Sequence, residues 1–189
     1  MCGIAGVLSK KSKLTNVAQT LDRFKKTLKH RGPDDEGVWY DSWLGCAHVR
    51  LSIVDISGGK QPMFTDSSKK IGIVFNGEIY NYKELKDILI KKGYNFSTKC
   101  DTEVIIKLYE AFGTDSFNML NGMFAFCIWD HTINTTYLVR DHMGIKPLYI
   151  YEDDEVLIFA SEIKAILNVP GVDLSLDVRG FQDYLTFRY

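Results

Sequence analysis

Apolar and polar residues recur along the chain with two different periods, which predict strands and helices. Short apolar runs bounded by turn residues predict strands over residues 3–8, 37–40, 43–50, 71–75, 123–129, 136–140, 148–151 and 156–160. An apolar face recurring every three or four residues predicts helices over residues 15–28, 81–92, 102–112, 162–167 and from 176 onward. Thr15 is the predicted N-cap of the first helix. Because the last four strands have hairpin-like spacing, they predict an antiparallel sheet.

The first predicted strand starts directly after Cys2, so this residue lies at the N-terminus of the chain. If Met1 is removed, Cys2 carries both a thiol and a free α-amine, whose reference pKa of about 7.7–8.0 lets it accept a proton near neutral pH. Every other backbone nitrogen is an amide and lacks this basicity. Cys2 is therefore a candidate nucleophile, although a cysteine at this position, taken alone, is more often an ordinary small apolar residue.

Composition and charge narrow the classes of function. The 189 residues suit one domain, and 23 basic against 24 acidic residues give a net charge of −1, which removes any bulk electrostatic case for nucleic acid or an anionic membrane. No apolar run is long enough for a membrane span, and the N-terminus has no signal-peptide pattern, so we expect a cytoplasmic protein. The widely spaced Cys46, Cys100 and Cys127 are expected to be buried thiols, and the cysteine and histidine spacing predicts no metal site.

Three more places carry residue types suited to binding or catalysis. Arg50 follows a strand, Asn76-Gly77-Glu78 is expected in a strand-to-loop turn, and Asp101 precedes a helix. Each has a simpler interpretation: a surface arginine, a turn-forming Asn-Gly, a solvated glutamate and a helix N-cap. Taken singly, the simpler interpretations are favoured.

Taken together with their surroundings, these residues form a series of motifs in a fixed order. The motifs are MCGIAG (1–6), HRGPD (30–34), RLSIVD (50–55), FNGEIYN (75–81), DTE (101–103), GMFAF (122–126), RDHMGIKPLY (140–149) and SEIKA (161–165). With them the chain resembles the class II glutamine amidotransferases, and within that class it is most similar to the glutaminase domain of glutamine-hydrolysing asparagine synthetases. The resemblance implies an α+β N-terminal-nucleophile hydrolase fold, a four-layer αββα sandwich of two antiparallel sheets between helices.

The resemblance also implies a role for each candidate residue in hydrolysing L-glutamine. Cys2 would be the nucleophile and its α-amine the base, while Arg50 would bind the substrate carboxylate. The remaining roles fall to residues 76–78 and 101: Asn76 and Gly77 would form the oxyanion hole, and Glu78 and Asp101 would receive the substrate ammonium. Gly77 would be needed for its backbone conformation and for close approach. His30 and His48 have no partner evident in the sequence that would make either of them a base.

The same resemblance implies a division of the chain. Residues 2–170 would form the glutaminase domain, and residues 171–189 would begin a C-terminal synthetase domain absent from this chain. No cofactor is expected in the glutaminase domain; ATP and Mg²⁺ are expected only in the synthetase partner, since no phosphate-binding loop is present. The parent enzyme is compatible with a homodimer. The alternatives are the glutaminase domain of a phosphoribosyl-pyrophosphate or glucosamine-phosphate enzyme, a silent regulatory domain, and an amidase or peptidase. The role of residues 140–149 is left open.

Overall fold

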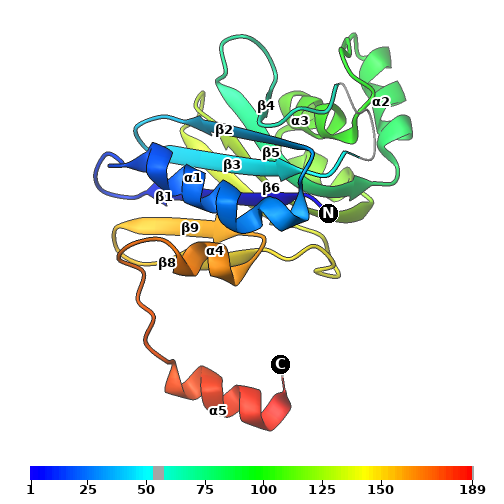
Figure 1. Ribbon diagram of the computed structural model, residues 1–189. Helices are drawn as coiled ribbons and strands as arrows, with labels where there is room; N and C mark the ends of the chain where they lie inside the picture. The colour runs from blue at the N-terminus through cyan, green and yellow to red at the C-terminus, as the bar shows by residue number, and fades with distance from the viewer. Residues whose placement is uncertain (53–57, 189) are drawn as a thin grey trace.

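Two antiparallel sheets form the centre of the molecule in the computed structural model, which describes residues 1–52 and 58–188 (Figure 1). The five-stranded sheet has the order β2 (Asp35–Tyr40), β3 (Leu44–Arg50), β1 (Gly3–Ser9), β9 (Val156–Ala160) and β8 (Tyr149–Glu152). The four-stranded sheet has the order β4 (Met63–Phe64), β5 (Ile71–Ile79), β6 (Gly122–Asp130) and β7 (Thr135–Arg140). The first strand of the chain is thus the middle strand of its sheet.

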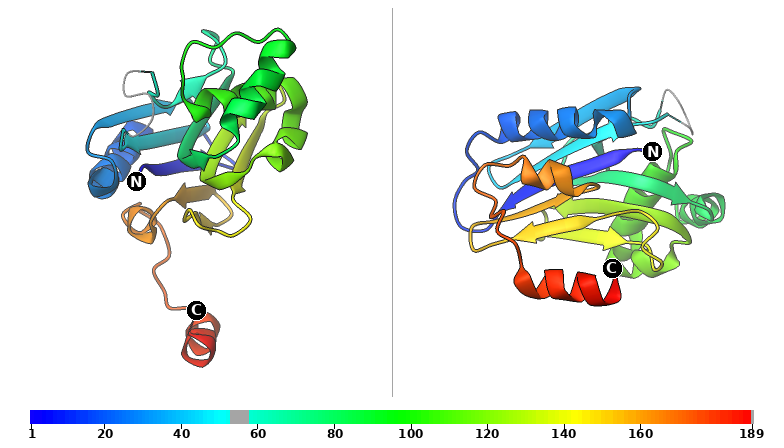
Figure 2. Two further views of the ribbon diagram at one scale, coloured as in Figure 1. Left: turned by 90° about the vertical axis from the view of Figure 1, so that its right-hand side faces the viewer. Right: turned by 60° about the horizontal axis from the view of Figure 1, so that its bottom comes forward.

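Helices cover the outer face of each sheet, as Figures 1 and 2 show from three sides. The helices α1 (Val17–Leu28) and α4 (Ile163–Leu167) pack on the five-stranded sheet, and α2 (Tyr82–Lys91) and α3 (Asp101–Phe112) lie on the side of the four-stranded sheet. Two short 3₁₀ helices, η1 (Lys29–Arg31) and η2 (Gly113–Met119), follow α1 and α3. The last helix, α5 (Val178–Phe187), projects away from these layers. The predicted four-layer αββα sandwich is confirmed.

Three clusters of buried side chains hold the four layers together. The cluster between the sheets includes Ile4, Trp129 and Phe159, whereas the two outer clusters join each sheet to its helices. Alternation along β1 explains how one strand serves two clusters, because Ile4 points to the other sheet and Ala5 to the helical side. Within the described residues, every helix is too short or too polar to span a lipid bilayer.

Most predicted elements are present, and the differences concern their ends. The N-cap of α1 is Asn16, in the left-handed conformation with φ 55°, and not Thr15. Residues 76–78 lie inside β5 and not in a turn, because β6 pairs with this strand along its whole length. Asp101 is the first residue of α3 and Cys100 its N-cap. Part of the RLSIVD motif (50–55) lies outside the described residues.

A buried histidine near the end of β3 connects the two sheets through the middle of β5. His48 is 1% exposed, and its Nε2 donates a hydrogen bond to the carbonyl oxygen of Phe75 at 3.2 Å. Burial lowers the pKa of His48 to about 4, against the effect of the Phe75 hydrogen bond and with a smaller contribution from the charge of Arg50. His48 is therefore neutral in the native protein and fixes the residues that follow it, Val49 and Arg50, relative to Asn76.

We predict that stability falls as the pH falls through the window from 6.5 to about 4, because the unfolded chain takes up a proton that native His48 does not. The linkage amounts to at most about 3 kcal/mol in the free energy of unfolding. Urea unfolding at the two ends of this window measures it. His48→Gln keeps a donor for Phe75 and should remove most of this contribution, whereas His142→Gln, at an exposed position, should leave it unchanged. Equal pH dependence in wild type and His48→Gln would contradict the prediction.

Candidate active site

All six residues singled out in the sequence line one cavity of about 110 Å³ at the end of the sandwich where β1 begins and β3 ends. The six are Cys2, Arg50, Asn76, Gly77, Glu78 and Asp101. They come from both sheets and from the first turn of α3. Strand pairing within each sheet, and the packing of one sheet on the other, bring these distant residues together.

The five-stranded sheet supplies the thiol and the cation. Cys2 lies immediately before β1, and the antiparallel pairing of Gly3 with Val49 brings it beside Arg50 at the end of β3. The Cys2 thiol donates to the carbonyl oxygen of Leu51 at 3.7 Å and is partly exposed. Arg50 is 5% exposed, so its charge lies within the cavity wall and not in bulk water. A guanidinium held this way is suited to a carboxylate.

The four-stranded sheet supplies a side-chain amide nitrogen that has no hydrogen-bond partner among the described residues. Asn76 follows Val74 on the face of β5 that meets the other sheet, and it is 1% exposed. Among the described residues, nothing accepts a hydrogen bond from its Nδ2. A buried donor left unpaired costs free energy, so such an atom in a cavity wall marks a place where a ligand oxygen binds.

Of the two reasons predicted for Gly77, the structure shows a close approach but no unusual backbone conformation. Its φ is not among the positive values found in the described chain, so no unusual backbone conformation is needed. A Cβ at this position would lie 2.2 Å from the carbonyl oxygen of Met123 and 2.7 Å from the Cα of Phe124. The close approach is therefore to β6. A side chain here would push β5 outward together with the neighbouring Asn76.

Two carboxylates also line the cavity, those of Glu78 and Asp101. Burial raises the pKa of Asp101, and the negative charge of Glu78 acts in the same direction, whereas backbone hydrogen bonds, the largest from Ile79, oppose both. The Ile79 N–H donates to Asp101 Oδ2 at 3.1 Å, which fixes the side chain. Glu78 is exposed. Two interacting carboxylates in one cavity form a site suited to an ammonium group.

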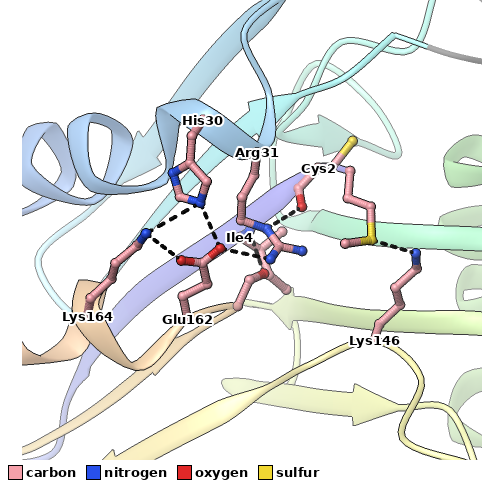
Figure 3. Close-up of polar contacts among 9 residues, drawn as sticks. Cys2, Ile4, His30, Arg31, Lys146, Glu162 and Lys164 are labelled. Carbon is pink, nitrogen blue, oxygen red and sulfur yellow. Dashed lines mark hydrogen bonds and ion pairs between the residues drawn. The ribbon is translucent and has the colours of Figure 1, made fainter.

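Sequence patterns gave no indication of the network that holds the N-terminus. Arg31 Nε donates to the Cys2 carbonyl oxygen, and its Nη1 donates to Glu162 Oε1, both at 2.9 Å (Figure 3). His30, for which the sequence offered no partner, also contacts Glu162 Oε1 at 2.9 Å. Arg31 and Glu162 each lie in a motif noted above, but 131 positions separate them. Only the fold brings them together.

The structure also gives residues 140–149 a role. The Asp141 carboxylate accepts backbone N–H groups, among them that of Lys146, and Arg140 donates to the carbonyl oxygens of Gly144 and Lys146. The folded loop directs Lys146 into the cavity, where its Nζ lies 3.4 Å from Met1 Sδ. The fold of residues 140–149 therefore places Lys146 in the cavity lining, and Figure 3 shows the side chain of Lys146 with its contact to sulfur.

The three other thiols are buried, as predicted. Burial raises the pKa of both Cys46 and Cys100, so these thiols stay protonated and unreactive near neutral pH. Cys2 is the most accessible of the four cysteines. Among the described residues, no group of three or more histidine, cysteine, aspartate or glutamate side chains is placed to hold a metal ion.

Comparison with known proteins agrees with this geometry. A family model described as a glutamine amidotransferase domain matches residues 1–189. The glutamine-hydrolysing asparagine synthetase 3 of Bacillus subtilis strain 168 is 40% identical over 97% of this chain and 30% of its own length. Asparagine synthetase B of Escherichia coli strain K12 is 37% identical over 89% of this chain and 30% of its own length. The chain thus spans about 30% of the length of these relatives.

Solved structures share the fold. The allosteric regulatory enzyme of purine biosynthesis superposes with a TM-score of 0.71 at 25% identity, over 87% of this chain and 43% of that chain. The glutamine phosphoribosylpyrophosphate amidotransferase of B. subtilis gives a TM-score of 0.70 at 23% identity over the same shares. The predicted N-terminal-nucleophile hydrolase fold is confirmed by these likenesses.

Proposed function

Because the chain belongs to the glutamine amidotransferase domain family, we propose that it hydrolyses L-glutamine to glutamate and ammonia through a thioester on Cys2. The observation that carries the proposal is the cavity itself. It places the accessible thiol of Cys2 with the buried Nδ2 of Asn76, which has no partner among the described residues, and it adds the guanidinium of Arg50 and the carboxylates of Glu78 and Asp101, with Lys146 also in the lining. This set of charges matches a zwitterionic amino acid with an amide at its far end. A silent regulatory domain would need no such set.

Binding would use the charges of the substrate. The guanidinium of Arg50 would hold the α-carboxylate through paired hydrogen bonds. The carboxylates of Glu78 and Asp101 would hold the α-ammonium, which would also remove their mutual repulsion. A peptide or simple amide lacks one or both of these charged ends, which disfavours the amidase and peptidase alternatives.

Catalysis would begin with transfer of the thiol proton to the α-amine of Cys2. The thiolate attacks the side-chain amide carbon, and Asn76 Nδ2 and the Gly77 N–H donate to the oxyanion. The C–N bond then breaks, the amine delivers its proton to the leaving nitrogen, and ammonia departs. Water attacks the thioester while giving a proton to the same amine. The C–S bond breaks, and the thiol is regenerated as glutamate leaves.

The first prediction tests the nucleophile and its base. Material trimmed to Cys2 should release glutamate from glutamine, whereas material retaining Met1 should not, because its Cys2 nitrogen is an amide and the Met1 side chain occupies the cavity at Lys146. Cys2→Ala should remove hydrolysis and leave folding intact, and Cys127→Ala, at a buried thiol of the inter-sheet core, should retain it. Intact mass and a glutamate-release assay decide the outcome. Equal activity with and without Met1 would exclude the α-amine as base.

The second prediction separates binding from chemistry. Asn76→Ala should lower kcat by a factor on the order of 10²–10³ if its amide donates to the oxyanion. Arg50→Lys should mainly raise KM, because its contact is with the unreacting carboxylate. Asn118→Ala, at an exposed position in η2, is the matched control. A change of KM alone in Asn76→Ala would remove the oxyanion role.

The ammonia acceptor is proposed from the relatives. At 37–40% identity the curated relatives are glutamine-hydrolysing asparagine synthetases, and they are longer than this chain. We therefore propose an ATP-dependent asparagine synthetase unit as the partner, in preference to a phosphoribosyl-pyrophosphate or glucosamine-phosphate enzyme. The requirement of that unit for ATP and Mg²⁺, a homodimeric parent enzyme and a cytoplasmic location stay predictions.

The end of the chain supports such a partner. Contacts with the sandwich continue as far as residue 173. Val172 packs against the buried side chains of the five-stranded sheet and α1, and the N–H of Asp173 donates to the Tyr151 hydroxyl. Beyond them, α5 presents exposed apolar side chains, namely Val178, Phe181, Tyr184, Leu185 and Phe187 (Figure 1). An amphipathic helix in this state needs a covering surface. We propose that the synthetase unit begins beyond Asp173, slightly later than the predicted boundary at residue 171, and that α5 packs on it.

The third prediction in this group tests the role of α5. Removal of residues 174–189 from this chain should leave kcat and Tm unchanged, because α5 would belong to the other unit. In the longer parent chain, Phe181→Asp should lower asparagine formed per glutamate released, while glutamate release persists. Val38→Asp, on an exposed position of β2, should not change that ratio. An unchanged ratio in Phe181→Asp would contradict the packing of α5 on the synthetase unit.

A further inference from the structure

The first residues of the chain are held from the junction of β9 and α4. Ser161 is fully buried; its Oγ accepts from the Ile4 N–H at 3.0 Å, and its own N–H donates to the Ile4 carbonyl oxygen at 2.8 Å. The next residue, Glu162, reaches Cys2 through Arg31. Two consecutive residues thus fix both ends of the segment from Cys2 to Ile4, and Figure 3 shows the connection from Glu162 through Arg31 to Cys2.

The guanidinium of Arg31 depends on Glu162. The Arg31 side chain is 9% exposed, and Glu162 is the only carboxylate bonded to it among the described residues. The Nη2 of Arg31 is buried and has no hydrogen-bond partner among the described residues. A buried cation that loses its anion is strongly destabilised. Without Glu162, Arg31 would turn toward water and release the Cys2 carbonyl oxygen.

Glu162 is suited to hold this position at all working pH values. Burial would raise its pKa, but hydrogen bonds from Lys164, Arg31 and His30 lower the pKa to about 2. Lys164 binds Oε2 at 2.9 Å, so Oε1 stays oriented toward Arg31 and His30. The carboxylate therefore stays ionised and fixed.

Gly3 opens the path that Arg31 takes to Cys2. A Cβ at residue 3 would lie 3.2 Å from the Cδ of Arg31 and 3.0 Å from a methyl carbon of Val49. With glycine there, the arginine side chain crosses β1 closely enough to bond the preceding carbonyl. Cys2 thus supplies the thiol and the carbonyl oxygen that Arg31 binds, and Gly3 leaves room for the Arg31 side chain.

We infer that Glu162 is a positioning residue for the nucleophile, acting through Arg31 on the carbonyl group of Cys2. The inference rests on the proposed function. The carbonyl carbon of Cys2 is bonded to the same Cα that carries the thiol arm and the α-amine. Fixing its oxygen therefore fixes the direction in which both groups project. Glu162 touches neither substrate nor reacting atoms, so its loss should reduce kcat and spare substrate binding.

The test uses Met1-free protein and a glutamate-release assay. Glu162→Ala should lower kcat on the order of 10- to 100-fold with KM within about twofold, as expected when a nucleophile is displaced by about 1 Å. Glu162→Gln keeps an oxygen acceptor for Arg31 and should recover part of the loss. Lys11→Ala removes an exposed ion pair with Glu155 that is not part of this network, and it should leave kcat within about twofold of wild type.

A double-mutant cycle distinguishes positioning from a general structural role. If Glu162 acts through Arg31, Glu162→Ala should cause no further loss of kcat in an Arg31→Met background. Additive losses, or a Glu162→Ala protein with wild-type kcat, would overturn the inference. If Glu162→Ala does not fold, Glu162→Gln is used in the same cycle with the same criteria. Wild-type protein that hydrolyses no glutamine would instead overturn the proposed function and this inference together, so the two failures are distinguishable.

Discussion

The site depends on the pairing of β1 with strands on both sides. This strand begins at the third residue and lies between β3 and β9, so its register fixes Cys2 without any intervening loop. A one-residue slip would turn Ile4 from the inter-sheet core toward the helices and carry the thiol with it. An N-terminal residue is usually the least ordered part of a chain. Here the pairing of Gly3 with Val49 and the bond from Arg31 to the Cys2 carbonyl oxygen fix Cys2 in position.

The second sheet completes the site because its face points at the first. Cys2 and Arg50 come from one sheet, and Asn76, Gly77 and Glu78 from the other. The buried hydrogen bond from His48 to Phe75 lies two residues before Arg50 and one before Asn76, so it ties the two contributions together. The polar cavity lies at an end of the sandwich and not at its centre. The centre is filled by Trp129, Phe159 and their apolar neighbours, where unpaired polar groups would cost free energy.

Local sequence patterns predicted most of the strands and helices but few of the contacts between distant residues. The strands and helices were predictable because their apolar periods are clear, and the candidate residues of the cavity were predictable because their motifs resemble those of a known family. The position of Asn76 in mid-strand was missed, since Asn-Gly ordinarily marks a turn and only the pairing with β6 overrides that preference. The contact of Glu162 with Arg31 was also missed. It joins residues 131 positions apart, and no local pattern specifies such a pair.

The contacts of Ser161 with Ile4, and of Glu162 with Arg31, can form only late during synthesis of the chain. β1 can pair with β3 once about fifty residues exist, but Ser161 and Glu162 must be made before they can grip Ile4 and Arg31. At the usual 5–20 residues per second, translation of the intervening hundred or so residues takes roughly 5–20 s. Throughout that interval one edge of β1 is open and the terminus is not yet clamped. A ribosome-associated aminopeptidase therefore meets Met1 on a looser chain than the one that finally folds around it.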